Sequence, residues 1–284
     1  LLLAIQWKSV ALRVKKDVSF LDILMVNAKG NIVDAITPGV KAGGELARVY
    51  ELRKRLKIGF GNAAIIIGLQ KSVSLLSFLF LTLSSLIWFS FTMGSKYGNY
   101  LYVFAVAILI FSVFLLAIIL FCLKPEIMIK PLKKIPGSHR FMRKIDKTLR
   151  DYSNTIKSLL NDKENFLSQM SLAIFIWMFY AFKLLLVMKG FTIEMDYISI
   201  AAITFLSYIM GMIPILPGSI GSFESTMLAL LAIKGIPMEA GLSIAFVFRF
   251  ATFWFEFIIS CFILVLHNVL VFSKKGDKNA GVRK

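Results

Sequence analysis

The chain has 284 residues, of which 58% are hydrophobic and 17% charged, and its mean hydropathy is +0.77. Soluble domains contain about 45–50% apolar and about 25% charged residues, so this composition excludes a water-soluble globular protein and predicts an integral membrane protein. The net charge of +17 indicates cytoplasmic loops that face anionic lipid head groups, and we expect no nucleic-acid partner.

The first 57 residues combine short apolar runs with polar ones. Residues 1–7 resemble the end of an apolar helix whose start is missing. Residues 18–36 are apolar but contain five polar side chains, namely Asp22, Asn27, Lys29, Asn31 and Asp34. Basic segments flank this stretch, and basic segments stay in the cytoplasm, so we predict that it enters and leaves the membrane on one side as a re-entrant hairpin. An amphipathic helix at the membrane surface is the alternative.

Four longer apolar stretches each have the roughly 20 residues that a transmembrane helix needs. They lie at about residues 62–91, 100–123, 166–188 and 241–272. A further stretch, 198–233, is broken near Pro214 and Pro217, and we predict a second re-entrant hairpin there. With the N-terminal stub, the sequence predicts an all-α polytopic membrane protein with about five or six transmembrane helices.

The positions of the basic residues predict the orientation. Of 33 Lys and Arg residues, 26 lie in 8–16, 41–57, 124–165 and 274–284, so we expect these segments, including the C-terminus, in the cytoplasm. The chain then divides into a first membrane repeat (1–123), a basic cytoplasmic connector (124–165), a second membrane repeat (166–272) and a basic cytoplasmic tail (273–284). Residues 139–160 of the connector predict either an amphipathic helix near the head groups or a solvated basic linker.

Two motifs in the two halves resemble each other. Pro38-Gly39 precedes Glu45 and Pro217-Gly218 precedes Glu224, in both cases with the glutamate seven residues after the proline. Each motif leads to a long apolar helix with a basic residue near its start, Lys71 in the first half and Arg249 in the second. The predicted topology gives the two units opposite orientations. Inverted repeats with Gly/Pro-interrupted segments at matching positions point to the substrate site of a transporter.

The motifs suggest how an anionic head group could bind. Proline ends a helix, glycine lets other groups approach the backbone, and the helix that follows presents free N–H groups to a phosphate. Simple helix punctuation is the alternative. Charges inside apolar segments cost about 2.5–3.5 kcal/mol on insertion scales, so we expect Glu224 to pair with Arg249 and Glu45 with Lys71. These pairs either belong to the substrate site or only lock each hairpin to its helix.

The candidate substrate-binding residues follow from these motifs and from the intramembrane charges. Arg48 and Tyr50, which follow Glu45 on a polar stretch, suit anionic head groups at the cytoplasmic surface, with a solvated basic face as the alternative. Lys183 and Lys234 are expected to reach the membrane surface from helix ends. The full set is Pro38, Gly39, Gly43, Gly44, Glu45, Arg48, Tyr50, Lys71, Pro217, Gly218, Gly221, Glu224, Arg249 and Glu256.

Nothing in the sequence predicts an enzyme. We find no P-loop, no His-rich metal pattern and no Gly-x-Ser-x-Gly nucleophile elbow, so we expect no catalytic residues, no metal site and no cofactor. Without an ATP site, transport would be passive or driven by an ion gradient.

The two motifs resemble the signatures of a known family. Residues 37–50, with Thr-Pro-Gly, Gly-Gly-Glu, Arg and Tyr, and residues 217–224, Pro-Gly-x-x-Gly-x-x-Glu followed by the Arg249 helix, are similar to the lysylphosphatidylglycerol synthase/flippase transmembrane region. That family includes the membrane half of the multiple peptide resistance factor, a flippase for aminoacylated phosphatidylglycerol. It also includes stand-alone bacterial and archaeal proteins, some beside glycosyltransferases.

The chain departs from the family pattern in three ways. Lys71 stands where Arg is usual, and Ser219 and Ser222 take positions that are often Gly. A soluble lysyl-transferase domain is not present in the sequence, so the resemblance does not imply synthesis of the lysyl-lipid.

The resemblance implies a lipid translocator in a prokaryotic plasma membrane. It would move an anionic or aminoacylated phospholipid, or a polyprenyl-phosphate-linked lipid, between leaflets. The alternative is a non-transporting accessory or scaffold protein, with a glycosyltransferase or lipid-modifying enzyme as its partner. A membrane-embedded transferase is the third hypothesis, which the sequence favours least.

Overall fold

The computed structural model describes residues 1–37, 42–94, 139–212 and 221–281, with short pieces between 106 and 120. Within these ranges every regular element is a helix, which confirms the prediction of an all-α protein. The predicted span at 100–123 falls largely outside the described residues. The elements are α1 (Leu2–Leu12), α2 (Phe20–Ile36), α3 (Ala42–Leu56), α4 (Phe60–Gly94), α7 (His139–Asn161), α8 (Lys163–Gly190), α9 (Tyr197–Gly211), α10 (Ser222–Ile233), α11 (Met238–Arg249), η3 (Phe250–Trp254) and α12 (Phe255–Gly281).

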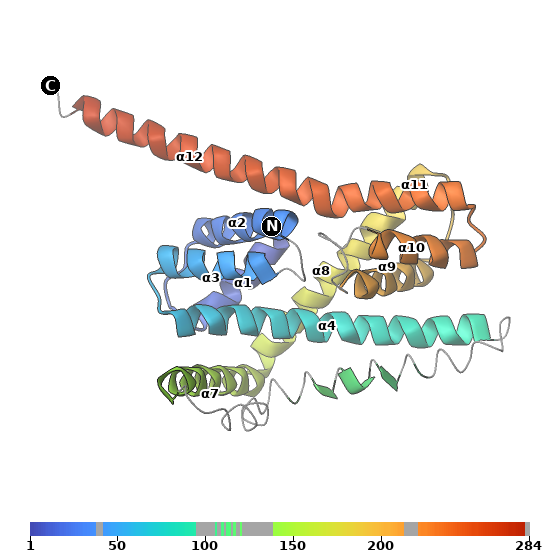
Figure 1. Cartoon of the computed structure of the whole chain (residues 1–284), viewed down its shortest axis with the longest axis horizontal. Coiled ribbons are helices and arrows are strands. Elements are labelled where there is room, and N and C mark those ends of the chain that lie inside the picture. The colour runs from blue at the N-terminus through green and yellow to red at the C-terminus, as the bar shows by residue number, and fades with distance from the viewer. Residues whose placement is uncertain are drawn as a thin grey trace.

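Three apolar stretches of the described chain are long enough to cross a membrane. They are Phe60–Trp88, Lys163–Gly190 and Met238–Leu270, and they correspond to three of the four predicted spans. At about 1.5 Å per residue each exceeds the roughly 30 Å of a hydrocarbon core. In the last of them α11, the π-helix η3 and the first part of α12 follow one another as one long helix (Figure 1).

Two pairs of shorter helices pack as hairpins: α2 with α3, and α9 with α10 (Figure 1). The prediction that residues 18–36 form a hairpin by themselves is wrong, because this stretch does not turn back on itself. Their polar side chains Asn27, Asn31 and Asp34 recur at helical spacing, so they lie along one unbroken helix, α2, and the basic segment α3 forms the second arm. The second hairpin is broken between α9 and α10, where the sequence predicts it.

The arms of these hairpins are short. With 17, 15 and 12 residues, α2, α9 and α10 extend about 26, 23 and 18 Å, less than the roughly 30 Å of a hydrocarbon core. These lengths are compatible with re-entrant hairpins, which stay a prediction. The residues that connect the two arms of each hairpin, among them Pro38, Gly39, Pro217 and Gly218, lie outside the described residues.

The two halves of the chain interlock. The long helix α4, which follows the first hairpin, packs against α9 of the second hairpin. The long helix α12, which follows the second hairpin, packs against α2 of the first. Helix α8 crosses the molecule and contacts α1, α4, α9 and α11 (Figure 1). Each hairpin therefore lies next to a long apolar helix of the other half.

The connector contains the helix α7, so over residues 139–161 the amphipathic-helix prediction fits better than a solvated linker. Its apolar face packs on α4 and α8, with Tyr152, Ile156 and Leu159 buried. Its other face exposes Arg150 and Lys157. The helix thus separates an apolar face from a charged one, as its sequence pattern requires.

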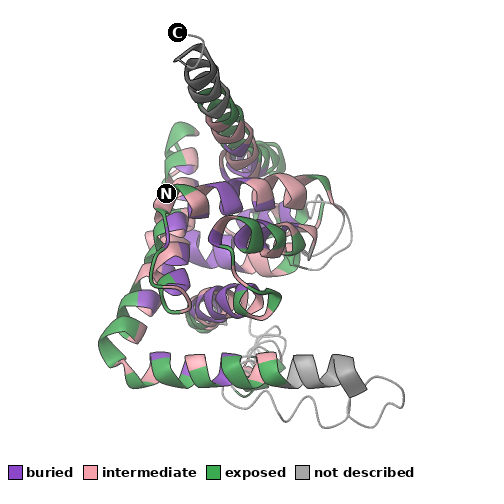
Figure 2. Ribbon diagram, turned by 90° about the vertical axis from the view of Figure 1, so that its left-hand side faces the viewer, coloured by how far each residue is buried: buried purple, intermediate pink, exposed green. Residues whose placement is uncertain are grey.

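Buried and exposed apolar residues are clearly separated in space. Figure 2 shows the buried residues gathered inside the helix assembly and the exposed ones mainly on its outside. Trp7 on α1 and Phe223 on α10 are fully covered, whereas Phe246 and Phe262 on the last span are 58% and 65% exposed. Soluble monomers rarely expose large contiguous apolar surfaces, so this outer surface suits contact with lipid.

Candidate functional site

A buried arginine is the centre of a polar cluster in the first hairpin. Arg48 on α3 is 5% exposed, and its Nη1 donates to Asp34 Oδ2 and to Glu45 Oε1, both at 2.9 Å. Its Nη2 donates to Asn31 Oδ1 at 2.7 Å, and its guanidinium lies 6.0 Å from the ring centroid of Trp7. The alternative that Arg48 belongs to a solvated basic face is therefore wrong, because three polar side chains enclose it.

Lys71 joins this cluster from α4. Its Nζ lies 2.7 Å from Glu45 Oε1, which is the ion pair that the sequence predicts. The same carboxylate oxygen accepts from Arg48, so two cations share one oxygen. The other oxygen, Glu45 Oε2, is buried and has no hydrogen-bond partner among the described residues. Tyr50, in contrast, is 61% exposed on the outer face of α3.

The glycines at the start of α3 allow a carboxylate to approach the backbone. The amide of Gly44 donates to Asp34 Oδ1 at 3.0 Å, and a Cβ on Gly44 would lie 2.1 Å from that oxygen. A Cβ on Gly43 would lie 2.4 Å from Thr37 Oγ1. The anion-binding start of the helix is thus occupied by a carboxylate of the protein.

The second hairpin contains a simpler pair. Arg249 on α11 and Glu224 on α10 are both buried, with Arg249 Nε 3.3 Å from Glu224 Oε1 although not in hydrogen-bonding geometry. The guanidinium lies 4.9 Å from the ring centroid of Phe223 and 4.8 Å from that of Phe253. Gly221, whose φ of +91° favours glycine, donates its amide to Glu224 Oε2 at 2.7 Å. The structure therefore contains both predicted ion pairs.

Glu256 belongs to a third polar group that the sequence did not reveal. Its Oε1 accepts from the Tyr180 hydroxyl at 3.0 Å and lies 3.9 Å from Lys183 Nζ. That ammonium also lies 4.8 Å from the ring centroid of Tyr180. Lys183 therefore points to a partner within the helix assembly rather than to the membrane surface as expected.

Helix α12 brings the first and third groups close together. Asn31, which binds Arg48, donates its Nδ2 to Ser260 Oγ at 3.4 Å. Ser260 in turn donates to the carbonyl oxygen of Glu256 at 2.7 Å, one turn back along α12. The polar cluster of the first hairpin thus contacts the helix that carries Glu256.

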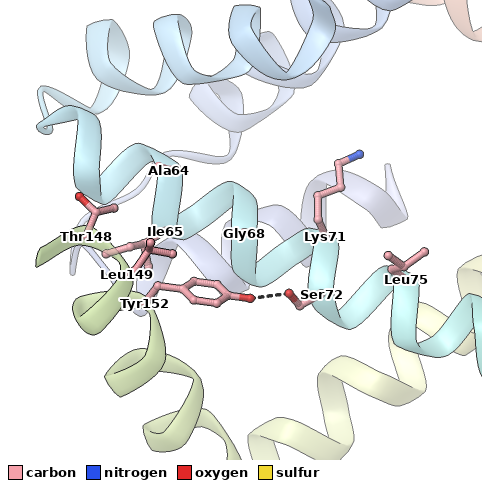
Figure 3. Close-up of a pocket in the computed structure, with 9 residues that line it drawn as sticks. All are labelled: Ala64, Ile65, Gly68, Lys71, Ser72, Leu75, Thr148, Leu149 and Tyr152. Carbon is pink, nitrogen blue, oxygen red and sulfur yellow. Dashed lines mark hydrogen bonds between the residues drawn. The ribbon is translucent and has the colours of Figure 1, made fainter. Parts of the chain in front are cut away.

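A cavity of about 330 Å³ lies beside the first cluster, between α4 and α7 (Figure 3). Tyr152 and Ser72 share a hydrogen bond of 2.5 Å at one side of it, while Lys71 extends from the other side of α4. Most of the remaining lining is apolar: Ala64, Ile65, Gly68, Leu75 and Leu149. Among the described residues, no group of three His, Cys, Asp or Glu side chains could bind a metal ion.

Comparison with known proteins gives consistent matches. The family model described as the lysylphosphatidylglycerol synthase TM region matches residues 1–260. A UPF0104 membrane protein of Methanothermobacter thermautotrophicus is 22% identical over 89% of this chain and 77% of its own length. The UPF0104 membrane protein MJ1595 of Methanocaldococcus jannaschii is 23% identical over 97% of this chain and 83% of its own. No solved structure matches.

Proposed function

This chain belongs to the lysylphosphatidylglycerol synthase transmembrane-region family, and from that premise we propose that it is a membrane lipid translocator. Its substrate is an anionic or aminoacylated phospholipid, or a polyprenyl-phosphate-linked lipid, which it moves between leaflets. The basic loops face the cytoplasm, and the two halves form inverted repeats with re-entrant hairpins.

The main observation behind this proposal is that each half of the chain contains an ion pair at a corresponding position. In each half a glutamate near the start of a hairpin arm pairs with a cation on the long helix that follows: Glu45 with Lys71 and Glu224 with Arg249. Neither pair is a strong contributor to stability: a half-exposed pair such as Glu45–Lys71 contributes about 0–1 kcal/mol, and in a buried pair such as Glu224–Arg249 desolvation offsets much of the attraction. Their presence at corresponding places in both halves therefore supports a role in binding.

The chemistry of these cations suits a lipid phosphate. Guanidinium and ammonium groups bind phosphate and carboxylate through similar charge-assisted hydrogen bonds, so a phosphate can replace the glutamate. In the empty protein Glu45 and Glu224 neutralise the two cations. In the loaded protein the phosphate takes their place while the lipid tail stays in the bilayer.

A leaflet-exchange assay with purified protein tests the proposal. Phosphatidylcholine vesicles would contain a trace of fluorescent phosphatidylglycerol, and dithionite quenching would report how much label reaches the outer leaflet. With wild-type protein, label from the inner leaflet should reach the outer one, so dithionite should quench the label of both leaflets. Charge-assisted hydrogen bonds contribute about 1.5–3 kcal/mol, so Arg249→Ala, which loses those to the lipid phosphate, should slow exchange by about tenfold or more. Glu224→Gln removes the carboxylate that displaces the phosphate from Arg249, so it should also slow exchange. Glu239→Gln, which changes an exposed carboxylate on α11, is the matched control.

The substrate class requires parallel probes. The same vesicles would be prepared with labelled lysyl-phosphatidylglycerol and with a polyprenyl-phosphate sugar. If folded wild-type protein exchanged none of the three lipids, the translocator proposal would fail and a non-transporting accessory protein would replace it.

A further inference from the structure

Glu256 lies where a charge is costly. The span Met238–Leu270 contains it 18 residues after the start and 14 before the end, about 20 Å from the nearer end. Its side chain is 42% exposed, on a helix that is mostly not covered by the rest of the described chain. A carboxylate at that depth is stable only if it is paired, hydrated or protonated.

The pairing of Glu256 is weak. Lys183 Nζ lies 3.9 Å from its Oε1, which is beyond hydrogen-bond distance. Tyr180 donates to the same oxygen at 3.0 Å, and a protonated carboxyl group could still accept this hydrogen bond through its carbonyl oxygen. The protonated form thus loses its attraction to Lys183 but keeps its other contact.

The neighbouring helices contribute few other charges. From α9, the ring centroid of Tyr208 lies 5.4 Å from that of Tyr180. The first hairpin approaches through the uncharged Asn31–Ser260 contact, and its charged groups pair among themselves: Arg48 with Asp34 and Glu45, Lys71 with Glu45, and Lys29 with Glu51. On α11, Arg249 pairs with Glu224. Among the described residues, Lys183 is the cation paired with Glu256.

We propose that Glu256 is the proton-binding site of this protein and that one proton moves with each anionic lipid, an inference that rests on the proposed function. A proton from water forms an O–H bond on the Glu256 carboxylate and removes its charge. The Lys183 ammonium then loses its counter-ion and binds the lipid phosphate at the point of its path where neither Lys71 nor Arg249 holds it. Because a phosphate replaces the carboxylate charge, proton and lipid cross together without changing the net charge of the site.

The return step reverses these exchanges. On the far side the proton leaves to water, the ionised Glu256 pairs again with Lys183, and the phosphate is released. The π-helix η3 ends two residues before Glu256, and such turns occur frequently at functional sites. The energy for directional transport then comes from a proton gradient.

The test measures where labelled lipid accumulates. Full-length protein would be placed in phosphatidylcholine vesicles with a trace of fluorescent phosphatidylglycerol, a pH difference of one unit and a membrane potential clamped at zero. One proton per lipid predicts up to about tenfold accumulation in the leaflet on the alkaline side, since one pH unit is a tenfold ratio of protons. Protein-free vesicles give the background, and Glu239→Gln should accumulate lipid like the wild type.

Two substitutions of Glu256 test whether this residue binds the proton. Glu256→Gln cannot bind a proton and should give the ratio of protein-free vesicles, whereas Glu256→Asp keeps a carboxyl group and should accumulate lipid. Wild-type protein that exchanges lipid but reaches equal amounts in both leaflets would overturn proton coupling and leave the translocator proposal intact. Accumulation that persists in Glu256→Gln would overturn the assignment to Glu256. If no lipid moved under any condition, both proposals would fail.

Discussion

Arg48 on α3 binds Asp34 on α2 through a 2.9 Å charged hydrogen bond between side chains that are 6% and 8% exposed. Removing one partner of a buried ion pair leaves an uncompensated charge, which costs about 3–5 kcal/mol. Arg48→Ala should therefore lower the free energy of unfolding by about that amount, measured by denaturant unfolding in detergent micelles. The exposed Arg53, on the same helix, is the control, and Arg53→Ala should change stability by less than about 0.5 kcal/mol. Equal unfolding midpoints for the two variants would show that the cluster does not stabilise the hairpin.

The two hairpin cations should respond differently to exchange between lysine and arginine. Arg249 lies within 5 Å of the rings of Phe223 and Phe253, so Arg249→Lys loses the planar group that stacks on them. Desolvated cation–π contacts contribute about 2 kcal/mol, so this variant should slow leaflet exchange by at least about tenfold. Lys71 is 45% exposed in its side chain, and Lys71→Arg should keep the wild-type rate. The dithionite assay compares them, and a faster Arg249→Lys than Lys71→Arg would contradict the stacking argument.

The ion pairs Glu45–Lys71 and Glu224–Arg249 could be predicted from the sequence. A charge inside an apolar stretch needs a partner of opposite charge, and the apolar stretches contain few charged residues. The Arg48–Asp34 contact could not be predicted, although the spacing of Asn27, Asn31 and Asp34 already places these side chains on one face of a helix. Their partner depends on how α2 and α3 pack, which no local pattern fixes.

Helix packing also explains why the structure differs from two other expectations, those for Lys183 and for residues 18–36. Lys183 and Glu256 are 73 residues apart, and their contact depends on α8 crossing the last span. The prediction that 18–36 forms a hairpin by itself came from the basic segments on either side of it. Such charges indicate on which side of the membrane a segment begins and ends, but not where it turns. Pro38 lies after that stretch, so the turn comes later and the second arm is the basic helix α3.

Gly44 should tolerate no side chain. Its amide binds Asp34, and a Cβ would lie 2.1 Å from the carboxylate, so Gly44→Ala must displace either Asp34 or the start of α3. Overpacking of this kind costs about 1–3 kcal/mol, and the unfolding midpoint in denaturant should fall accordingly. Gly59→Ala is the matched control, since nothing lies within 4 Å of its would-be Cβ. If both variants unfolded alike, the close approach of Asp34 would have no energetic importance.

Asp162 should make the thermal stability of the folded protein depend on pH in the acid range. It caps α8 before the span begins, and the Asn165 side chain, followed by Arg13, holds the pKa of its carboxyl below the ordinary value. A lowered pKa in the folded state adds stability that is present above the unfolded pKa of about 3.9 and is lost as pH falls through the folded pKa. Asp162→Asn should therefore have a lower thermal midpoint than the wild type near neutral pH. The two midpoints should converge once the pH is below the folded pKa, because the wild-type carboxyl is then neutral as well. Glu239→Gln, at an exposed site on α11, should show no such convergence, and a difference for Asp162→Asn that stayed constant across the acid range would rule out its charge as the cause.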